Sequence, residues 1–388
     1  MRADHRISIF VLIDALGWPC VETHNFLADA LPYRQPLRTV LGYSSGAIPT
    51  ILTGIPPALH GHWNLLYFDP NGSPFRWLRH FQFLPDAVLD HRVTKKVLKE
   101  MGRHVLGLGP LFECCVSPRF LPWFNWTEQK CIYSPEGIRT RNSVFDLLAQ
   151  KQIPHRVYTY HHLSDPQILR RARQDLHSGK ASFYFIYLSE LDHVLHFHAL
   201  DSLKVRSTLS WYARELGKIF KAAQGASPDV AFTVCSDHGM TPVDHRYDLV
   251  SEVDSLRLSV PDDYLAVYDS TMARFWFFNE PACDKITARL NSLPCGRILP
   301  DDELEDLGIL FPDRRYGELI FLLDPGWLVA RGHFNGNAWN PTGMHGYHPA
   351  DPYSDAVFLS NRSPATEMRT IADLYPLMVE ATSEVLHA

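Results

Sequence analysis

The chain has 388 residues, enough for one large α/β domain or two domains of ordinary size. Its net charge of −6 gives no reason to expect a nucleic acid polymer as a partner, and its 46% hydrophobic residues are typical of a globular protein. The seven cysteines include no CxxC pair and indicate reduced thiols, and no apolar run is long enough to span a membrane. We therefore expect a cytoplasmic protein.

The first predicted strand, Ile7–Ile13, is almost entirely apolar, as expected of a strand buried on both faces of a parallel sheet. Asp14 follows it directly. A second strand is predicted over residues 37–41, and a Gly/Ser turn then opens a short helix over 48–53. Ser44 lies in this turn, where a serine is most often a helix cap. The alternative is a nucleophile whose phosphoryl adduct would face the helix amides.

Between about residues 64 and 134 the periodicity is lost and aromatic residues accumulate. We predict that this segment is a cap inserted over the edge of the sheet. Its aromatic side chains are expected to form the cap's own small core rather than a stacking surface. Regular alternation then returns, with helices predicted over 143–150 and 166–176 and strands over 155–160 and 183–188.

Polar residues follow the next two apolar strands. Asp192 and His196 come after strand 183–188 and would share one face of a helix that begins there. A long helix over 201–223 leads to a strand over 230–235, after which Asp237 and His238 stand side by side. Ligands of open α/β sheets bind at the carboxyl ends of strands, and Asp with His suits a divalent metal.

The remainder of the chain predicts a small second lobe between about residues 255 and 330. His345 follows in a glycine-flanked loop. The whole pattern predicts a single α/β domain over residues 1–388, with a doubly wound, mostly parallel sheet and helices on both faces. The predicted elements of this part are strands over 264–267, 273–278, 318–323 and 356–359, and helices over 285–293 and 366–385.

This order of residues resembles the alkaline phosphatase superfamily, most closely its type I phosphodiesterase/nucleotide pyrophosphatase family. The resemblance spans most of the chain and is weakest in segment 64–134. It is carried by VLIDALG around Asp14, ILTGIPPALHG at 51–61, ELDHVLH at 190–196, CSDHGMT at 235–241, RYGELIFLLDPGW at 315–327 and GMHGY at 343–347.

The resemblance implies two divalent metal ions, Zn²⁺ ahead of Mn²⁺, in two sites. One site would use Asp192, His196 and His345. The other would use Asp14, Asp237 and His238, with the nucleophile as a further ligand. Counting back from Thr53 and Gly54 places that nucleophile at Ser44, with Ser45 as the alternative.

Two further residues match substrate-binding positions of the family. Asn64 lies next to the position of an amide that steadies a phosphoryl oxygen. Tyr187 matches one wall of a nucleotide-base pocket, although a tyrosine in an apolar strand is more often part of the core. An aromatic residue follows the nucleophile in the nucleotide pyrophosphatases, but Ser45 follows here, which argues against a nucleotide substrate.

The resemblance thus implies a two-metal phosphohydrolase, most closely a phosphodiesterase that cleaves a small-molecule phosphate ester through phosphoserine. One alternative is a phosphomonoesterase or a phosphotransferase similar to phosphoglycerate mutase, since these relatives share the ligand set. Another alternative is a metal-binding protein without catalytic activity.

Overall fold

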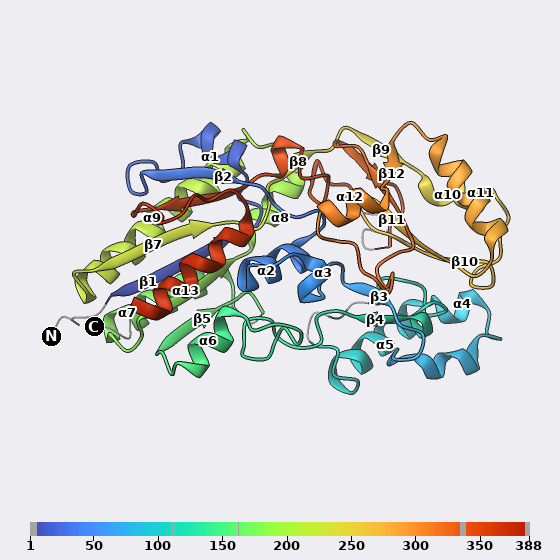
Figure 1. The fold of residues 1–388 in the computed structure, drawn as a ribbon, viewed down its shortest axis with the longest axis horizontal. Helices are drawn as coiled ribbons and strands as arrows, with labels where there is room; N and C mark the ends of the chain where they lie inside the picture. The colour runs from blue at the N-terminus through green and yellow to red at the C-terminus, as the bar shows by residue number, and fades with distance from the viewer. Residues whose placement is uncertain (1–5, 110–111, 113, 162, 334–338, 385–388) are drawn as a thin grey trace.

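The computed structural model describes residues 6–109, 112, 114–161, 163–333 and 339–384. A six-stranded sheet in the order β2-β16-β7-β1-β6-β5 forms one half of the molecule (Figure 1). Only β16 runs antiparallel to its neighbours, so the mostly parallel sheet predicted from the sequence is confirmed. The strands are β1 (Ile7–Ile13), β2 (Tyr33–Leu37), β5 (His155–Tyr158), β6 (Phe183–Leu188), β7 (Val230–Cys235) and β16 (Ala356–Ser360).

Helices cover both faces of this sheet, as predicted. Successive residues of β1 point to opposite faces, so Ile9 and Val11 pack in one core while Phe10 and Leu12 pack in the other. The first core is covered by α1 (Trp18–His24), α7 (Asp165–Ser178), α8 (Glu190–Phe197) and α9 (Leu203–Ala226). The second core is covered by α2 (Ser44–Thr53), α6 (Val144–Gln150) and α13 (Leu374–Glu384).

The register of the central strands determines what meets at the sheet edge. Strand β1 lies between β6 and β7, with Ile13 opposite Leu188 and Leu12 opposite Cys235. The chain segments that follow these three parallel strands therefore leave the sheet next to one another. All three strands are buried, which explains their nearly continuous apolar sequences.

Several predicted elements are shifted: α2 begins at Ser44 rather than at residue 48, and the helix predicted over 285–293 is α11 (Glu280–Asn291). Strand β2 lies four residues before the predicted position, because it is an edge strand whose sequence YRQPL has no apolar run. The last helix begins at Leu374 rather than near residue 366, after a capping box between Thr370 and Asp373 and a 3₁₀ turn, η4 (Ile371–Asp373). Its predicted end at Val385 lies outside the described residues.

Segment 64–134, which we call the cap, packs against the second lobe. Its aromatic side chains, including Phe75, Phe124 and Trp126, form a buried core as predicted, but Leu265 and Trp276 of the lobe share this core. The cap contains β3 (Leu66–Phe68), η1 (Arg76–Phe81), α4 (Asp86–Leu89), α5 (Arg92–His104), η2 (Leu121–Trp123) and β4 (Phe124–Trp126).

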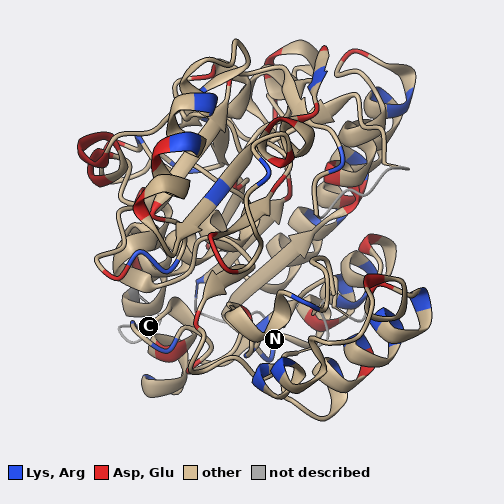
Figure 2. Ribbon diagram, turned by 90° about the vertical axis from the view of Figure 1, so that its right-hand side faces the viewer, with Lys and Arg blue, Asp and Glu red and all other residues tan. Residues whose placement is uncertain are grey.

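The second lobe has its own antiparallel sheet in the order β10-β11-β13-β12. Acidic and basic residues are interspersed on the face that the cap and this lobe present in Figure 2. Within the described ranges, no helix combines the length and apolar character needed to cross a membrane. The lobe contains α10 (Leu249–Asp254), β10 (Tyr264–Tyr268), β11 (Met272–Phe277), α11 (Glu280–Asn291), β12 (Gly296–Ile298), α12 (Asp301–Asp306) and β13 (Leu319–Leu323). The remaining short elements are α3 (Pro57–His60), β8 (Thr241–Pro242), β9 (His245–Tyr247), β14 (Trp327–Val329), β15 (Gly343–Met344) and η3 (Pro352–Ser354).

Candidate active site

Three aspartates meet where β1, β6 and β7 end. Asp14 directly follows β1, Asp192 lies in the first turn of α8, and Asp237 follows β7 after one serine. The register of the strands thus gathers carboxylates from positions far apart in the sequence. Histidines from α8, from the end of β7 and from the loop after β15 join them in two clusters.

The first cluster consists of Asp14, Asp237 and His238, all buried. His238 Nε2 lies 3.6 Å from Asp14 Oδ1 and 3.2 Å from Asp237 Oδ2. The His238 Nδ1–H donates to the carbonyl oxygen of Gly239 at 2.9 Å, which directs Nε2 toward the carboxylates. One ligand atom from each residue lies within 4.8 Å of the others.

The second cluster consists of Asp192, His196 and His345. His196 is one helical turn after Asp192, and its Nε2 lies 3.4 Å from Asp192 Oδ2, while His345 Nε2 lies 3.7 Å from Asp192 Oδ1. The His196 Nδ1–H donates to the carbonyl oxygen of Gly343 at 2.9 Å. The rings of His345 and His238 stack with centroids 3.8 Å apart, so the two clusters are in direct contact.

Unpaired polar atoms in these clusters fit two divalent cations. Asp14 Oδ1, Asp192 Oδ1 and Asp237 Oδ2 are buried without a hydrogen-bond partner among the described residues. Burial raises the pKa of Asp14 far above its ordinary value, and repulsion from Asp237 and Asp192 adds to this effect. Burial and the nearby His238 lower the pKa of His345, which keeps its ring neutral as a metal ligand requires. Mixed oxygen and nitrogen donors of this kind bind Zn²⁺ or Mn²⁺.

Ser44 is the first residue of α2, and its Oγ lies 3.0 Å from His238 Nε2. The helix therefore presents this hydroxyl to the first cluster. The neighbouring Ser45 hydroxyl instead donates to the carbonyl oxygen of Trp63 at 2.7 Å. The two candidate nucleophiles thus have different environments, and only the Ser44 hydroxyl is bonded to a cluster residue.

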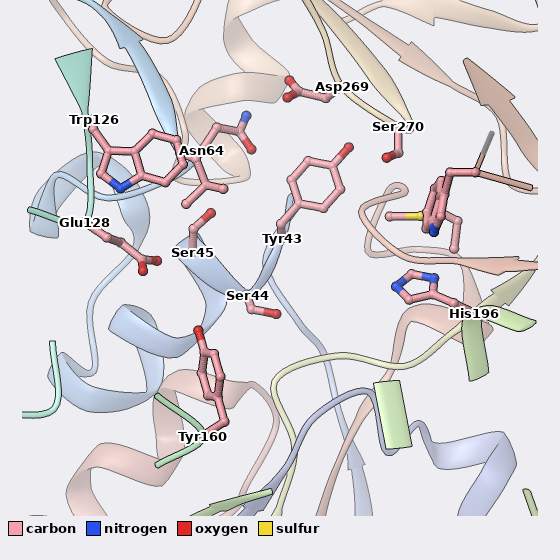
Figure 3. A pocket seen from close by; sticks show the side chains of 13 residues that line it. Tyr43, Ser44, Ser45, Asn64, Trp126, Glu128, Tyr160, His196, Asp269 and Ser270 are labelled. Atoms are coloured by element: carbon pink, nitrogen blue, oxygen red, sulfur yellow. The ribbon is translucent and has the colours of Figure 1, made fainter. Parts of the chain in front are cut away.

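A cavity of about 390 Å³ opens next to Ser44. The cap, the lobe and the sheet edge all contribute to its walls (Figure 3). Its acidic side chains are Glu128 and Asp269, and no lysine or arginine lines it in the part of the chain that the structure describes. The lining residues are Tyr43, Ser44, Ser45, Asn64, Leu65, Trp126, Glu128, Tyr160, His196, Asp269, Ser270, Trp339 and Met344.

The two predicted substrate-binding residues have different positions. Asn64 lines the cavity, and its buried Oδ1 has no partner among the described residues. Tyr187 is buried and does not belong to the cavity wall; its hydroxyl donates to Asp14 Oδ2. The structure therefore places Tyr187 behind a candidate metal ligand rather than in the substrate-binding wall expected for it. Tyr160, whose ring contacts Tyr187 edge-on, faces the cavity instead.

Sequence reasoning missed several lining residues. Glu128 and Trp126 belong to the cap, where only an aromatic core was predicted, and Tyr160 lies just after β5. Asp269, in the turn between β10 and β11, and Trp339, which contacts the His196 ring, are further members. No spacing signal could have identified them, because they meet only when the cap and the lobe fold over the sheet edge.

Comparison with known protein families identifies the chain as a phosphoester hydrolase of the alkaline phosphatase superfamily. The model of the family described as type I phosphodiesterase/nucleotide pyrophosphatase matches residues 43–348, well over half of the sequence. The chain belongs to this family, as the sequence motifs predicted. No curated protein sequence matches the chain.

Solved structures with the same fold have low sequence identity. Murine ectonucleotide pyrophosphatase/phosphodiesterase 5 is 16% identical, with a TM-score of 0.69 over 97% of this chain and 95% of that chain. An inactive variant of the murine protein in complex with AMP is 16% identical, with a TM-score of 0.67 over 98% of this chain and 95% of that chain. Phosphonoacetate hydrolase from Sinorhizobium meliloti 1021, in complex with phosphonoformate, is 13% identical. Its TM-score is 0.65 over 98% of this chain and 96% of that chain.

Proposed function

We propose that the protein is a two-metal phosphodiesterase that cleaves a small phosphate ester through a phosphoserine at Ser44. The observation that carries this proposal is the position of the Ser44 hydroxyl, 3.0 Å from His238 and at the mouth of the cavity. Asp14, Asp237, His238 and Ser44 would hold one cation, and Asp192, His196 and His345 the other. When bound, the two cations supply the charge that activates the serine oxygen and stabilises the leaving oxygen.

The chain's own residues account for the covalent steps. Ser44 Oγ attacks phosphorus, the bond to the leaving oxygen breaks, and the proton lost by Ser44 ends on that oxygen, which leaves as an alcohol. Water then attacks phosphorus, the Ser44 Oγ–P bond breaks, and the serine regains a proton. The first-turn amides of α2 and the side chain of Asn64, which lines the cavity, would hold the phosphoryl oxygens.

The charges of the cavity favour a diester over a monoester. A monoester is a dianion near neutral pH and gains from additional cationic side chains, but no lysine or arginine is found among the described residues that line the cavity. Glu128 and Asp269 add negative charge instead. A nucleotide is also disfavoured, because the residue after Ser44 is a small serine whose hydroxyl is bonded to Trp63 rather than an aromatic ring.

Paired chromogenic esters test this proposal. The purified protein, loaded with Zn²⁺ or Mn²⁺, should have a higher kcat/KM for bis(4-nitrophenyl) phosphate than for 4-nitrophenyl phosphate. A preference for the monoester would favour a phosphatase or phosphotransferase. Absence of turnover with either ester and either metal would support a non-catalytic metal-binding protein.

The choice of metal and the location remain part of the proposal. We expect two Zn²⁺ ions per chain by elemental analysis, with Mn²⁺ as the alternative, because both metals accept Asp and His donors. All seven cysteines are free thiols, which supports a location in the reducing cytoplasm. Cell fractionation tests this location.

A further inference from the structure

The turn between β10 and β11 of the second lobe reaches the start of the helix that carries Ser44. Tyr43 is the N-cap residue of α2, and its carbonyl oxygen accepts from the amide of Gly46 at 2.8 Å. Its hydroxyl group points toward Asp269 and Ser270, which belong to this turn and line the same cavity (Figure 3). The conformation of Tyr43 sets the direction in which α2 begins, and with it the direction in which Ser44 is presented.

Thr271, the last residue of this turn, holds the Tyr43 hydroxyl group with two hydrogen bonds. The Thr271 amide donates to Tyr43 Oη at 3.1 Å, and Tyr43 Oη lies 3.0 Å from Thr271 Oγ1. The Thr271 hydroxyl itself donates to the carbonyl oxygen of Gly346 at 2.9 Å, so in the second bond Tyr43 is the donor. Burial raises the pKa of the Tyr43 hydroxyl, which keeps it in the protonated form that this bond requires.

The same threonine also holds the loop that carries His345. Gly346 directly follows His345, and its φ of 96° lies in the left-handed region that favours glycine. A Cβ atom at residue 346 would lie 2.9 Å from Thr271 Oγ1 and 2.8 Å from the Tyr43 ring, so these groups pack closely. The Tyr43 ring also meets the His345 ring edge-on, with centroids 5.6 Å apart. Thr271 is thus bonded to the residue before Ser44 and to the residue after His345.

A buried ion pair fixes this turn in place. Arg274 Nε lies 2.8 Å from Asp269 Oδ2, and both side chains are almost completely buried. The same guanidinium group donates through Nη1 to the carbonyl oxygen of Leu66 in the cap at 2.9 Å and to that of Tyr316 at 3.3 Å. Hydrogen bonds from a charged group are stronger than those between neutral groups. The turn is therefore tied to both the lobe and the cap, and it holds Thr271 in one position.

We propose that Thr271 is a positioning residue for the phosphoryl transfer, an inference that rests on the proposed function. Through Tyr43 it directs Ser44 toward the first cluster, and through Gly346 it holds His345 in the second cluster. Thr271 is fully buried and is not among the described residues that line the cavity, so it acts through these neighbours and not by contact with the substrate. The lobe thereby sets the position of the nucleophile relative to the second cluster.

Thr271→Val keeps the shape of the side chain and removes its hydroxyl group. The variant should bind the more weakly held Zn²⁺ about tenfold less tightly, because a hydrogen bond that orients a ligand loop is lost. With saturating Zn²⁺, its kcat for bis(4-nitrophenyl) phosphate should fall at least about tenfold while KM changes less than about twofold, since a misplaced nucleophile impairs reaction more than binding. Thr271→Ser retains the hydroxyl and should restore both Zn²⁺ affinity and kcat to within about threefold of the wild type. Titration of the metal-free, full-length protein with Zn²⁺ against a chromogenic chelator measures the affinity.

Tyr43→Phe separates the two connections. It removes the hydroxyl that links Thr271 to the N-cap of α2, whereas the bond from Thr271 to Gly346 remains. Its kcat should fall as in Thr271→Val, but its Zn²⁺ affinity should stay within about twofold of the wild type. An unchanged kcat in Tyr43→Phe would contradict the link to Ser44, and this test applies even where Thr271→Val does not fold.

Thr208→Val is the matched control. It removes another buried hydroxyl, which donates to the carbonyl oxygen of Lys204 at 3.0 Å within α9, outside the cavity and both clusters. The control should retain the wild-type kcat and Zn²⁺ affinity. Circular dichroism shows whether each variant is folded.

The outcomes separate this inference from the proposed function. Wild-type kcat and Zn²⁺ affinity in folded Thr271→Val would overturn the inference and leave the phosphodiesterase assignment in place. Failure of Thr271→Ser to restore the two values would assign the effect to side-chain packing and would equally overturn it. A wild-type protein that turns over neither chromogenic ester would contradict the phosphodiesterase assignment, whereas weaker Zn²⁺ binding in Thr271→Val and its recovery in Thr271→Ser would still support the link to His345.

Discussion

The hydroxyl of Ser44 lies 3.0 Å from the Nε2 of His238 and so connects the start of α2 with the end of β7. His238 uses its other ring nitrogen to donate to Gly239 at 2.9 Å. In the neutral ring, Nε2 is therefore an acceptor, and Ser44 donates to it. A cation on Nε2 would replace this hydrogen bond, and the contact then places the serine oxygen beside the nitrogen that would hold that cation.

Ser44→Ala is expected to abolish the phosphoprotein intermediate and to lower kcat by at least about a thousandfold, because the other candidate nucleophile, Ser45, is bonded to Trp63 rather than to a cluster residue. The metal content should remain near two per chain, since the six other ligands are unchanged. Rapid acid quench followed by mass spectrometry of the phosphopeptide detects the intermediate.

Ser45→Ala is the matched control. Its hydroxyl donates to the Trp63 carbonyl oxygen, so its loss should cost about 1 kcal/mol of stability and only a small fraction of kcat. If the phosphate maps to Ser45, or if Ser45→Ala is the inactive variant, the register of the nucleophile is wrong by one residue.

Asp237→Asn should reduce the metal content to below two per chain and lower turnover by orders of magnitude. The Asp237 Oδ1 accepts from the backbone amides of Ala15 at 3.3 Å and His238 at 3.1 Å, and an asparagine oxygen can keep both bonds. The fold should therefore survive while the negative charge is lost. Elemental analysis and circular dichroism measure the two effects separately. Full metal content in this variant would exclude Asp237 as a ligand.

Tyr187→Phe removes the hydroxyl that donates to Asp14. Outer hydrogen bonds of this kind orient metal ligands, so the variant should bind metal about 10–100-fold more weakly. At saturating metal, the KM for bis(4-nitrophenyl) phosphate should change little, because Tyr187 does not line the cavity. A large change in KM with unchanged metal affinity would instead restore Tyr187 to the substrate-binding wall.

Acid should destabilise the protein through His60. This residue is fully buried, its Nδ1 accepts from the amide of His62 at 3.2 Å, and its Nε2 lies 3.0 Å from the Thr50 hydroxyl. Burial, with repulsion from His62, lowers the pKa of His60 to about 3. In the unfolded chain the pKa of His60 is about 6.5, so the unfolded chain binds a proton at His60 more readily than the folded chain does. The unfolding free energy contributed by His60 is thus unaffected above pH 6.5 and falls by about 1.4 kcal/mol per pH unit below it.

Urea unfolding of metal-free protein between pH 7 and pH 5 measures this slope without interference from metal release. His60→Gln removes the titrating group, so its unfolding free energy should fall less steeply with acid than that of the wild type. Parallel slopes for the two proteins would show that His60 titrates normally.

The sequence indicated the residues of the two candidate metal clusters, which the structure brings together, but it did not indicate the walls of the cavity. The strands β1, β6 and β7 are buried on both faces, so each has a continuous apolar sequence whose end is marked by a polar residue. Asp14 and Asp237 could therefore be assigned to one sheet edge before the structure was known. The grouping of these residues with Asp192, His196, His238 and His345 came from the family resemblance, and the strand order that explains it is given by the structure.

The cavity could not be predicted in the same way. Glu128 and Asp269 come from the cap and from the lobe, and each lies in a turn or an irregular segment without periodicity. Tyr187 shows the opposite error: its place in the motif suggested a substrate contact, but its position in β6 turns its hydroxyl toward Asp14. The apolar pattern of the sequence indicates where the buried strands begin and end, whereas the walls of the cavity depend on how distant segments of the chain pack together.

Asp14 and Asp237 follow the paired strands β1 and β7, so their separation is set largely by the hydrogen-bond ladder of the sheet, whose strands are about 4.8 Å apart. That spacing is a property of the backbone and is insensitive to changes in the cap. Exchange of residues 64–134 between members of this family should therefore transfer preference for one alcohol over another while leaving metal binding unchanged. The chain is in this sense modular: its reaction chemistry and its discrimination between substrates can evolve at different rates.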